Sequence, residues 1–233
     1  MFPTVHGPAG RRCAAVLAAI GAPAPAAAAT LEVSVLDERG RPIENVAIYA
    51  TAPPGVGEHG ATGAALAAAA DERTAVMDQQ NLQFAPHVLV VQSGTEVAFP
   101  NSDSVSHHVY SFSEAKTFEL PLYKGEVYAP VVFDRPGIVV VGCNIHDGML
   151  GYVVVVDTPH FALTNAAGVA HVEGLPAGEY TIAAWTPRVR PAGLPPGMRV
   201  VVAGTDAAAE IRIAGRLAPA HEHGDSSLTW ERY

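Results

Sequence analysis

Residues 142–149 read Gly-Cys-Asn-Ile-His-Asp-Gly-Met and place a thiol, an imidazole and a thioether close together, at Cys143, His146 and Met149. An apolar run, residues 137–141, precedes this stretch, and a second, residues 151–156, follows it. Runs of this length predict two buried strands, so the stretch is expected to form the short connection between them. Thiolate and thioether favour copper among the common metals, and imidazole also suits copper. The stretch therefore predicts a soft metal site that still needs one ligand, a second histidine from elsewhere in the chain.

Two tandem histidines, His107 and His108, are the candidates for that ligand. A blue-copper site combines two histidines and one cysteine in a near-trigonal arrangement with a weak axial methionine. Neighbouring residues on a strand point to opposite faces of the sheet, so only one of the two histidines should face the metal. Strand alternation alone does not choose between them. Asn101 and Asp103 read as turn residues that tie the loop before the histidines.

Short strands joined by turns rich in Gly and Pro run through the rest of the chain. Residues 30–50 read as a β-hairpin around a turn at 37–42, and residues 116–128 read as a loop with short strand pieces. Strands at such short intervals are typical of an antiparallel sandwich or barrel, so the chain is expected to be all-β. The further strands are expected at 84–91, 96–99, 106–112, 129–133, within 164–185, at 200–202 and at 211–213.

Charge and hydropathy exclude some classes of partner. The formal net charge of the 233 residues is −9, and no basic cluster appears, which argues against a nucleic-acid partner. An acidic surface instead favours a basic protein partner with salt-sensitive association. No segment after the N-terminus is long and apolar enough to predict a membrane span.

The first 29 residues have the features of a signal peptide. Two arginines supply positive charge, residues 13–20 form a short apolar core, and small residues follow. Export by this peptide, with cleavage just before Thr30 or a little earlier, would place the chain in the periplasm or outside the cell. It would also remove Cys13 and leave Cys143 as the single cysteine, without an internal disulfide partner.

A catalytic function fits the stretch 142–149 less well than a ligand function. Cys143 and His146 could act as nucleophile and base, but beyond Asp147 no orienting acid or oxyanion stabiliser is evident, and Met149 would have no role. Zinc also fits less well, because thioether is a poor zinc ligand. The residues favour a copper protein that is not an enzyme.

Residues 76–157 resemble the cupredoxins, the blue-copper proteins of the plastocyanin and amicyanin type. The resemblance rests on FxPxxLxV at 84–91, on FxNxDxxxHxV at 99–109, and on Pro-Gly at 136–137 followed by the stretch 142–149. It implies a Greek-key β-sandwich with one type 1 copper ion. The ligands that it implies are His107, Cys143, His146 and Met149, with His108 near the sulfur through its backbone.

This resemblance also implies a function and a partner. The protein would be a single-electron carrier, or a redox subunit of a larger enzyme complex, with the ring edge of His146 as the port for electrons. Its partner would be a redox protein such as a cytochrome or a dehydrogenase, bound transiently. More narrowly, the chain resembles bacterial proteins labelled methylamine utilisation protein, which share FPNSD at 99–103, HHVYSFS at 107–113, FELPLY at 118–123 and GCNIHD at 142–147. Those relatives carry a bulky aromatic residue where this chain has Gly148.

The flanking segments resemble a second family, the carboxypeptidase regulatory-like or transthyretin-like sandwich, at residues 33–48 and 164–185. A cupredoxin is therefore expected to be inserted into a small second β-sandwich. That second sandwich also motivates an alternative function, a non-redox module that handles copper or binds protein or glycan. The expected organisation is a signal peptide at 1–29, a sandwich at 30–50 plus 160–215, a linker at 51–75, a cupredoxin domain at 76–157 and an irregular tail at 216–233.

Overall fold

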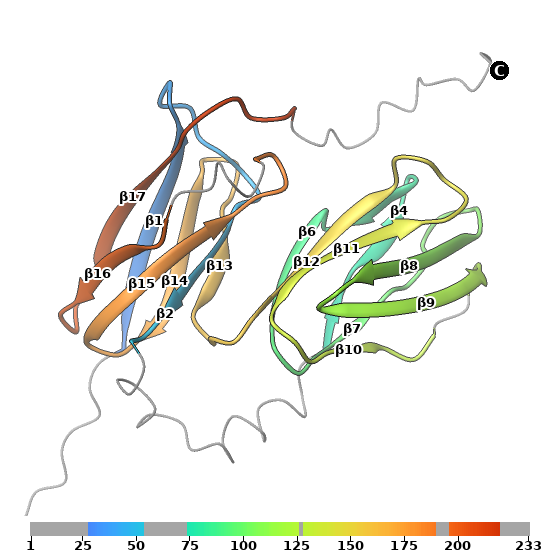
Figure 1. Ribbon diagram of the computed structural model, residues 1–233, viewed down its shortest axis with the longest axis horizontal. Coiled ribbons are helices and arrows are strands. Elements are labelled where there is room, and N and C mark those ends of the chain that lie inside the picture. The colour runs from blue at the N-terminus through green and yellow to red at the C-terminus, as the bar shows by residue number, and fades with distance from the viewer. Residues whose placement is uncertain (1–27, 54–73, 126–127, 190–195, 220–233) are drawn as a thin grey trace, which may run out of the picture.

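The computed structural model describes residues 28–53, 74–125, 128–189 and 196–219 (Figure 1). Most of the predicted signal peptide, linker and C-terminal tail lie outside the described residues. In the described part the regular structure consists of seventeen strands, which confirms the all-β prediction. The same part of the chain contains no helix that is long and apolar enough to cross a membrane.

The described residues between 74 and 156 form one β-sandwich, on the right in Figure 1. Its larger sheet has the strand order β6-β12-β11-β8-β9, and it faces the small sheet β10-β7-β3 and the hairpin β4-β5. Phe84, Phe133, Val139 and Val153 are fully buried in the core between these layers. The strands are β3 (Thr74–Val76), β4 (Asp78–Gln80), β5 (Gln83–Ala85), β6 (Val88–Gln92), β7 (Thr95–Ala98), β8 (His107–Ser113), β9 (Lys116–Tyr123), β10 (Val131–Phe133), β11 (Gly137–Cys143) and β12 (Leu150–Val156).

The segments on either side of that sandwich form a second one, on the left in Figure 1. The sheet β14-β1-β17 packs on the sheet β13-β2-β15-β16, and Leu31, Val33, Ile48 and Val172 are buried between them. The strands are β1 (Ala29–Asp37), β2 (Ala47–Thr51), β13 (Phe161–Leu163), β14 (Val169–Leu175), β15 (Gly178–Trp185), β16 (Met198–Val202) and β17 (Ala207–Ile213). The first sandwich therefore interrupts the second between β2 and β13.

The run of valines in β12 explains how the two sandwiches pack together. Val153 and Val155 point into the core of the first sandwich, whereas Val154 and Val156 lie in an apolar cluster with Ala47 of the second sandwich. Successive side chains of a strand point to opposite faces, so a continuous apolar run is stable only where both faces are covered. The second sandwich covers the outer face of β6 and β12.

The predicted hairpin at residues 30–50 is wrong, because β1 and β2 belong to opposite sheets. β1 pairs with β14 and β17, whereas β2 pairs with β13 and β15. Thr164 holds the connection between β1 and β2 against the segment after β13. Its hydroxyl donates to the carbonyl oxygen of Ile43 at 2.8 Å and accepts from the N–H of Val46 at 2.9 Å.

Two further expectations on strands are corrected. The segment expected to be a loop with strand pieces at 116–128 contains β9, a continuous strand at the sheet edge. His107 and Val109 of β8 face Tyr123 and Leu120 of β9, so the ladder shifts by one residue around Pro121. An edge strand with a bulge tolerates the missing N–H of proline. The single strand expected at 84–91 is two strands, β5 and β6, separated by the cis peptide bond before Pro86.

Candidate metal centre

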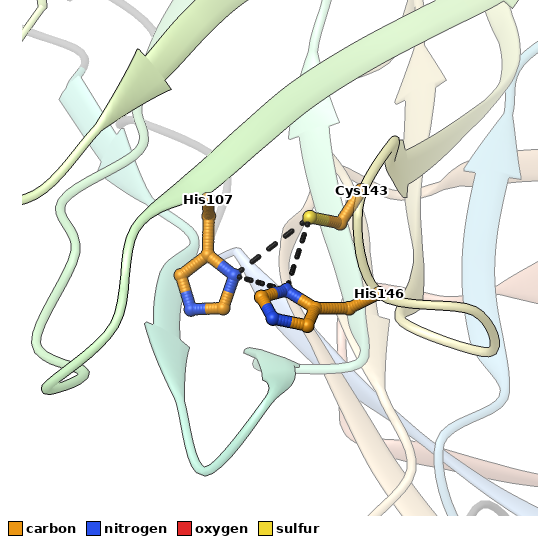
Figure 2. Close-up of side chains that lie close together, drawn as sticks. All are labelled: His107, Cys143 and His146. Atoms are coloured by element: carbon orange, nitrogen blue, oxygen red, sulfur yellow. Dashed lines mark hydrogen bonds between the residues drawn. The ribbon is translucent and has the colours of Figure 1, made fainter. Parts of the chain in front are cut away.

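His107, Cys143 and His146 meet at one end of the first sandwich, where their side chains converge (Figure 2). The Nδ1 atoms of the two histidines are 3.1 Å apart. The cysteine Sγ lies 3.7 Å from Nδ1 of His107 and 3.5 Å from Nδ1 of His146. His107 and Cys143 are buried, and His146 is partly exposed. The structure thus brings together three of the four residues predicted as ligands.

The spacing of these three atoms suits a first-row metal ion. The point equidistant from three atoms with these separations lies about 2.0 Å from each, which is close to the bond lengths of metal ions to imidazole and thiolate. Both histidines present Nδ1, and the sulfur completes a triangle. Two imidazoles and one thiolate in a trigonal arrangement are the strong donors of a blue-copper site.

Neighbouring strands bring His107 and Cys143 together. Cys143 is the last residue of β11 and lies opposite Val109 in the ladder, and His107 is two residues away on the same face of β8. The N–H of Asn144 donates to the carbonyl oxygen of His108 at 3.0 Å and continues this ladder past the cysteine. Cys143 was expected in the loop, but it is the last residue of the strand. The ladder therefore fixes the direction of its side chain more firmly than a loop would.

The loop after Cys143 carries His146 back toward the sulfur. The N–H of Met149 donates to the carbonyl oxygen of His146, and the N–H of Cys143 donates to that of Met149, both at 3.2 Å. Gly148 has a φ of +82°, a conformation that glycine adopts without strain. This tight turn sets the side chain of His146 beside those of His107 and Cys143.

The tandem histidines take different roles. The ring of His107 is completely buried in the site. His108 points to the other face, where its Nε2 lies 2.8 Å from a carboxylate oxygen of Glu119. Strand alternation thus excludes His108 from the site, as expected for one of the pair.

Asp103 orients His107, a role that the sequence reading did not assign. Its Oδ2 lies 2.8 Å from Nε2 of His107, and its carboxylate also accepts the N–H groups of Asn81 at 2.6 Å and Leu82 at 2.9 Å. A carboxylate accepts hydrogen bonds, so Nε2 of His107 carries the proton and Nδ1 keeps a free lone pair. This arrangement matches the carboxylate–histidine pairs that orient metal ligands. The only sequence signal was the spacing of four residues between the two side chains.

Burial lowers the pKa of His146, and the nearby His107 lowers it further. The imidazole is therefore held neutral near pH 7, the form that can donate its Nδ1 lone pair to a metal. The exposed side chains of Ile145 and Leu150 flank this partly exposed ring along the chain. His146 is the member of the site that reaches the surface.

Met149 is buried in the same apolar cluster as Cys143. Its backbone closes the loop, as described above, and its role as a sulfur ligand stays a prediction.

His87 lies apart from the site: its Nδ1 is 3.1 Å from the carbonyl oxygen of Leu150, and its ring packs edge-on against Tyr152.

Two polar residues, the half-buried Asn101 and the buried Tyr123, support the loop that leads to His107. Asn101 donates through Nδ2 to the carbonyl oxygens of Val105 and Tyr123, both at 3.0 Å, as its expected turn role requires. The hydroxyl of Tyr123 donates to the carbonyl oxygen of Phe99 at 2.6 Å, and burial raises the pKa of Tyr123 to about 12. The neutral phenol is thus fixed as a donor beneath the site.

No family model and no curated protein sequence matches this chain. Solved structures similar to part of it include a copper-containing nitrite reductase from Thermus scotoductus SA-01, 27% identical over 36% of this chain and 23% of its own, with a TM-score of 0.34. A purple cupredoxin from Nitrosopumilus maritimus is 25% identical over 36% of this chain and 100% of its own, with a TM-score of 0.31. A reduced amicyanin variant is 24% identical over 36% of this chain and 84% of its own, with a TM-score of 0.34. The chain thus spans less than a quarter of the nitrite reductase, and these TM-scores leave the assignment of function to the site itself.

Proposed function

We propose that this protein binds one copper ion through His107, Cys143 and His146 and transfers single electrons. The observation that carries the proposal is the triangle of two Nδ1 atoms and one Sγ atom with sides of 3.1, 3.5 and 3.7 Å. Met149 is proposed as the fourth, weaker ligand, because it closes the same loop and is buried beside Cys143. Thiolate and thioether together favour copper over zinc.

Bound copper would supply the one-electron chemistry by cycling between its +1 and +2 states. The chain's contribution is to keep the donor atoms in place in both states. Cys143 is held by the ladder between β8 and β11, and His107 is held by Asp103. Ligands fixed by strands and hydrogen bonds move little on electron transfer, which supports a carrier function.

His146 is the proposed route for electrons to a partner, because its ring is the part of the site that meets solvent. Ile145 and Leu150 beside it, and Leu82 and Val105 in the loops around Asp103, are exposed apolar side chains. Small apolar contacts suit brief encounters between redox proteins. The net charge of −9 favours a basic partner, and the signal-like N-terminus favours a location in the periplasm or outside the cell.

Copper loading followed by visible spectroscopy and voltammetry tests this proposal. The full chain should show an intense thiolate-to-copper band and a reversible one-electron couple, and Cys143→Ser should lose both. His108→Ala, which changes a histidine that faces Glu119 outside the site, is the matched control and should keep both. A colourless copper complex without a couple would refute the carrier function.

The second sandwich favours one alternative, because a simple electron carrier does not need those additional strands. A module that handles copper would bind the ion through the same three side chains and pass it on as Cu(I). Such a protein would exchange copper rapidly with a Cu(I) chelator, whereas a carrier would retain it through many redox cycles. Repeated cycling in the presence of the chelator therefore separates the two functions.

A further inference from the structure

A cleft of about 1420 Å³ lies between the two sandwiches. The outer face of β11 and β12 forms one wall. Trp185, the last residue of β15, lies against this wall. The other walls come from loops of the second sandwich: the turn at 37–41, residues 187–189 after β15 and residues 214–219 after β17. In Figure 1 the segment after β17 extends toward the first sandwich. Clefts at the junction of two folded units are common positions for small-molecule sites.

One wall of this cleft is aromatic and apolar. The rings of Tyr152 and Trp185 lie 5.4 Å apart at an angle of 56°. Ile138 and Val140 continue the wall, because they point outward from β11 while Val139 and Val141 fill the core. Val140 is 41% exposed, so part of this apolar wall is open to solvent. A flat apolar group can lie against such a surface.

The opposite wall is positively charged, in a chain whose net charge is −9. Four arginines line the cleft, Arg39, Arg41, Arg188 and Arg216, against two carboxylates, Asp37 and Glu38. Arg41 is neutralised by Asp37 at 2.7 Å, and Glu38 accepts the N–H of Gly215 at 3.0 Å. Among the described residues, the other three guanidinium groups have no carboxylate partner.

Arg188 is held in place before any ligand arrives. Its Nε donates to the carbonyl oxygen of Ala218 at 2.9 Å, and its own carbonyl oxygen accepts the N–H of Ala218 at 2.8 Å. This reciprocal pair joins two walls of the cleft. A guanidinium fixed through Nε still has its terminal nitrogens available to bind a carboxylate with two parallel hydrogen bonds.

Arg188 and Tyr152 also line an adjoining cavity of about 460 Å³ that reaches Gly148 and Leu150 of the metal-centre loop. A Cβ atom built on Gly148 would have no heavy atom within 4 Å, so the loop leaves this side open. The two cavities share Tyr152, Pro187 and Arg188 among their lining residues, so the smaller cavity connects this part of the cleft with the metal-centre loop.

We propose that this cleft binds a small organic anion that combines a carboxylate with an aromatic ring. Arg188 and Arg216 pair with the carboxylate, and the ring lies against Tyr152 and Trp185. The proposal does not depend on copper, because none of these residues belongs to the metal centre.

Calorimetric titration of the full chain with para-hydroxybenzoate tests the proposal. We expect binding at one site per chain that weakens as salt is added, because the pairing is partly electrostatic. The neutral para-hydroxybenzamide should bind at least about tenfold more weakly, since it lacks the charge-assisted hydrogen bonds. Cyclohexanecarboxylate keeps the charge but not the flat ring, and should also bind more weakly.

Substitutions locate the site. Arg188→Gln should weaken binding about tenfold, and Arg216→Gln, which changes an exposed side chain with no described partner, should weaken it several-fold. Arg212→Gln is the matched control, because Arg212 is exposed on β17 and pairs with Glu210 outside the cleft, at 2.8 Å. No heat of binding at millimolar ligand, equal affinity for the benzamide, or full affinity in both cleft variants would overturn the proposal.

Discussion

Each sandwich has an aspartate that accepts hydrogen bonds in a connection between strands, and the two carboxylates act differently. In the second sandwich Asp37 accepts the N–H groups of Arg39 and Arg41 and the guanidinium of Arg41, all at 2.7–2.9 Å. Hydrogen bonds from Arg41, its backbone N–H foremost, hold the pKa of Asp37 below its usual range. Every one of these partners belongs to the same turn, so the carboxylate only closes its own loop.

Asp103 in the first sandwich joins three separate parts of the chain. It accepts N–H groups from the turn between β4 and β5 and binds the ring of His107 at the start of β8. The difference between the two aspartates shows how a loop residue can contribute to a functional site. A loop residue becomes functional when its polar atoms reach beyond its own turn to orient a side chain that has chemistry of its own.

The largest expected difference between the sandwiches concerns their histidines. His107→Ala should abolish tight copper binding, because it removes one of three strong donors and leaves a void in the site. His108→Ala and His160→Ala should bind copper as the unchanged chain does, since His108 faces Glu119 and His160 lies in the second sandwich. Equilibrium competition with a copper chelator measures the affinities. An unchanged affinity in His107→Ala would contradict the proposed ligand set.

The two aspartates allow a smaller and more discriminating comparison. Asp103→Asn should weaken copper binding by about 10- to 100-fold, because the amide orients the ring of His107 less strongly. Asp37→Asn should lower the melting temperature and leave copper affinity unchanged. Both variants are measured by the same competition assay and by thermal unfolding. A loss of copper affinity in Asp37→Asn would show that the two sandwiches are not independent.

The smallest expected effect is a loss of folding stability at alkaline pH, and it depends on the buried tyrosines. Burial raises the pKa of Tyr123 to about 12 and also raises that of Tyr180 in the second sandwich. A raised pKa means that the fold favours the neutral phenol, so this stability is complete below the unfolded pKa near 10 and is lost as pH rises toward 12. Between pH 10 and 12 the unchanged chain should lose roughly 1 kcal/mol more stability than Tyr123→Phe.

Urea unfolding at several alkaline pH values measures this difference. Tyr180→Phe should show the same trend with a smaller amplitude, because no large shift accompanies the burial of Tyr180. Identical alkaline losses in the unchanged chain and in Tyr123→Phe would show that Tyr123 is not held neutral by the fold.

The sequence predicted the features that depend on local spacing. The pattern of Cys143, His146 and Met149 between two apolar runs indicated a strand, a tight turn and a strand, and the structure has β11, the loop and β12 there. The valine run of β12 indicated a strand that is covered on both faces, because the residues that point to either face are apolar. These features need only neighbouring residues, which is why a pattern is sufficient.

Features that depend on distant contacts were beyond the sequence pattern. The hairpin expected at 30–50 is wrong because the partners of β1 and β2 are strands more than a hundred residues away, and Thr164 from that distant part bonds the connection between them. The role of Asp103 depends on the packing of three segments, and the arginine cleft depends on how two sandwiches lie against each other. The choice of His107 over His108 came from the family resemblance, because the alternation of side chains along a strand did not show which of the two faces the metal.

X-ray absorption spectroscopy of the copper-loaded chain reports the atoms around the metal and therefore tests whether Cys143 and two histidines bind it. We expect one short sulfur neighbour and two imidazole nitrogens in the unchanged chain, and loss of the short sulfur in Cys143→Ser. A copper environment of nitrogen and oxygen alone, or a spectrum that Cys143→Ser leaves unchanged, would contradict it.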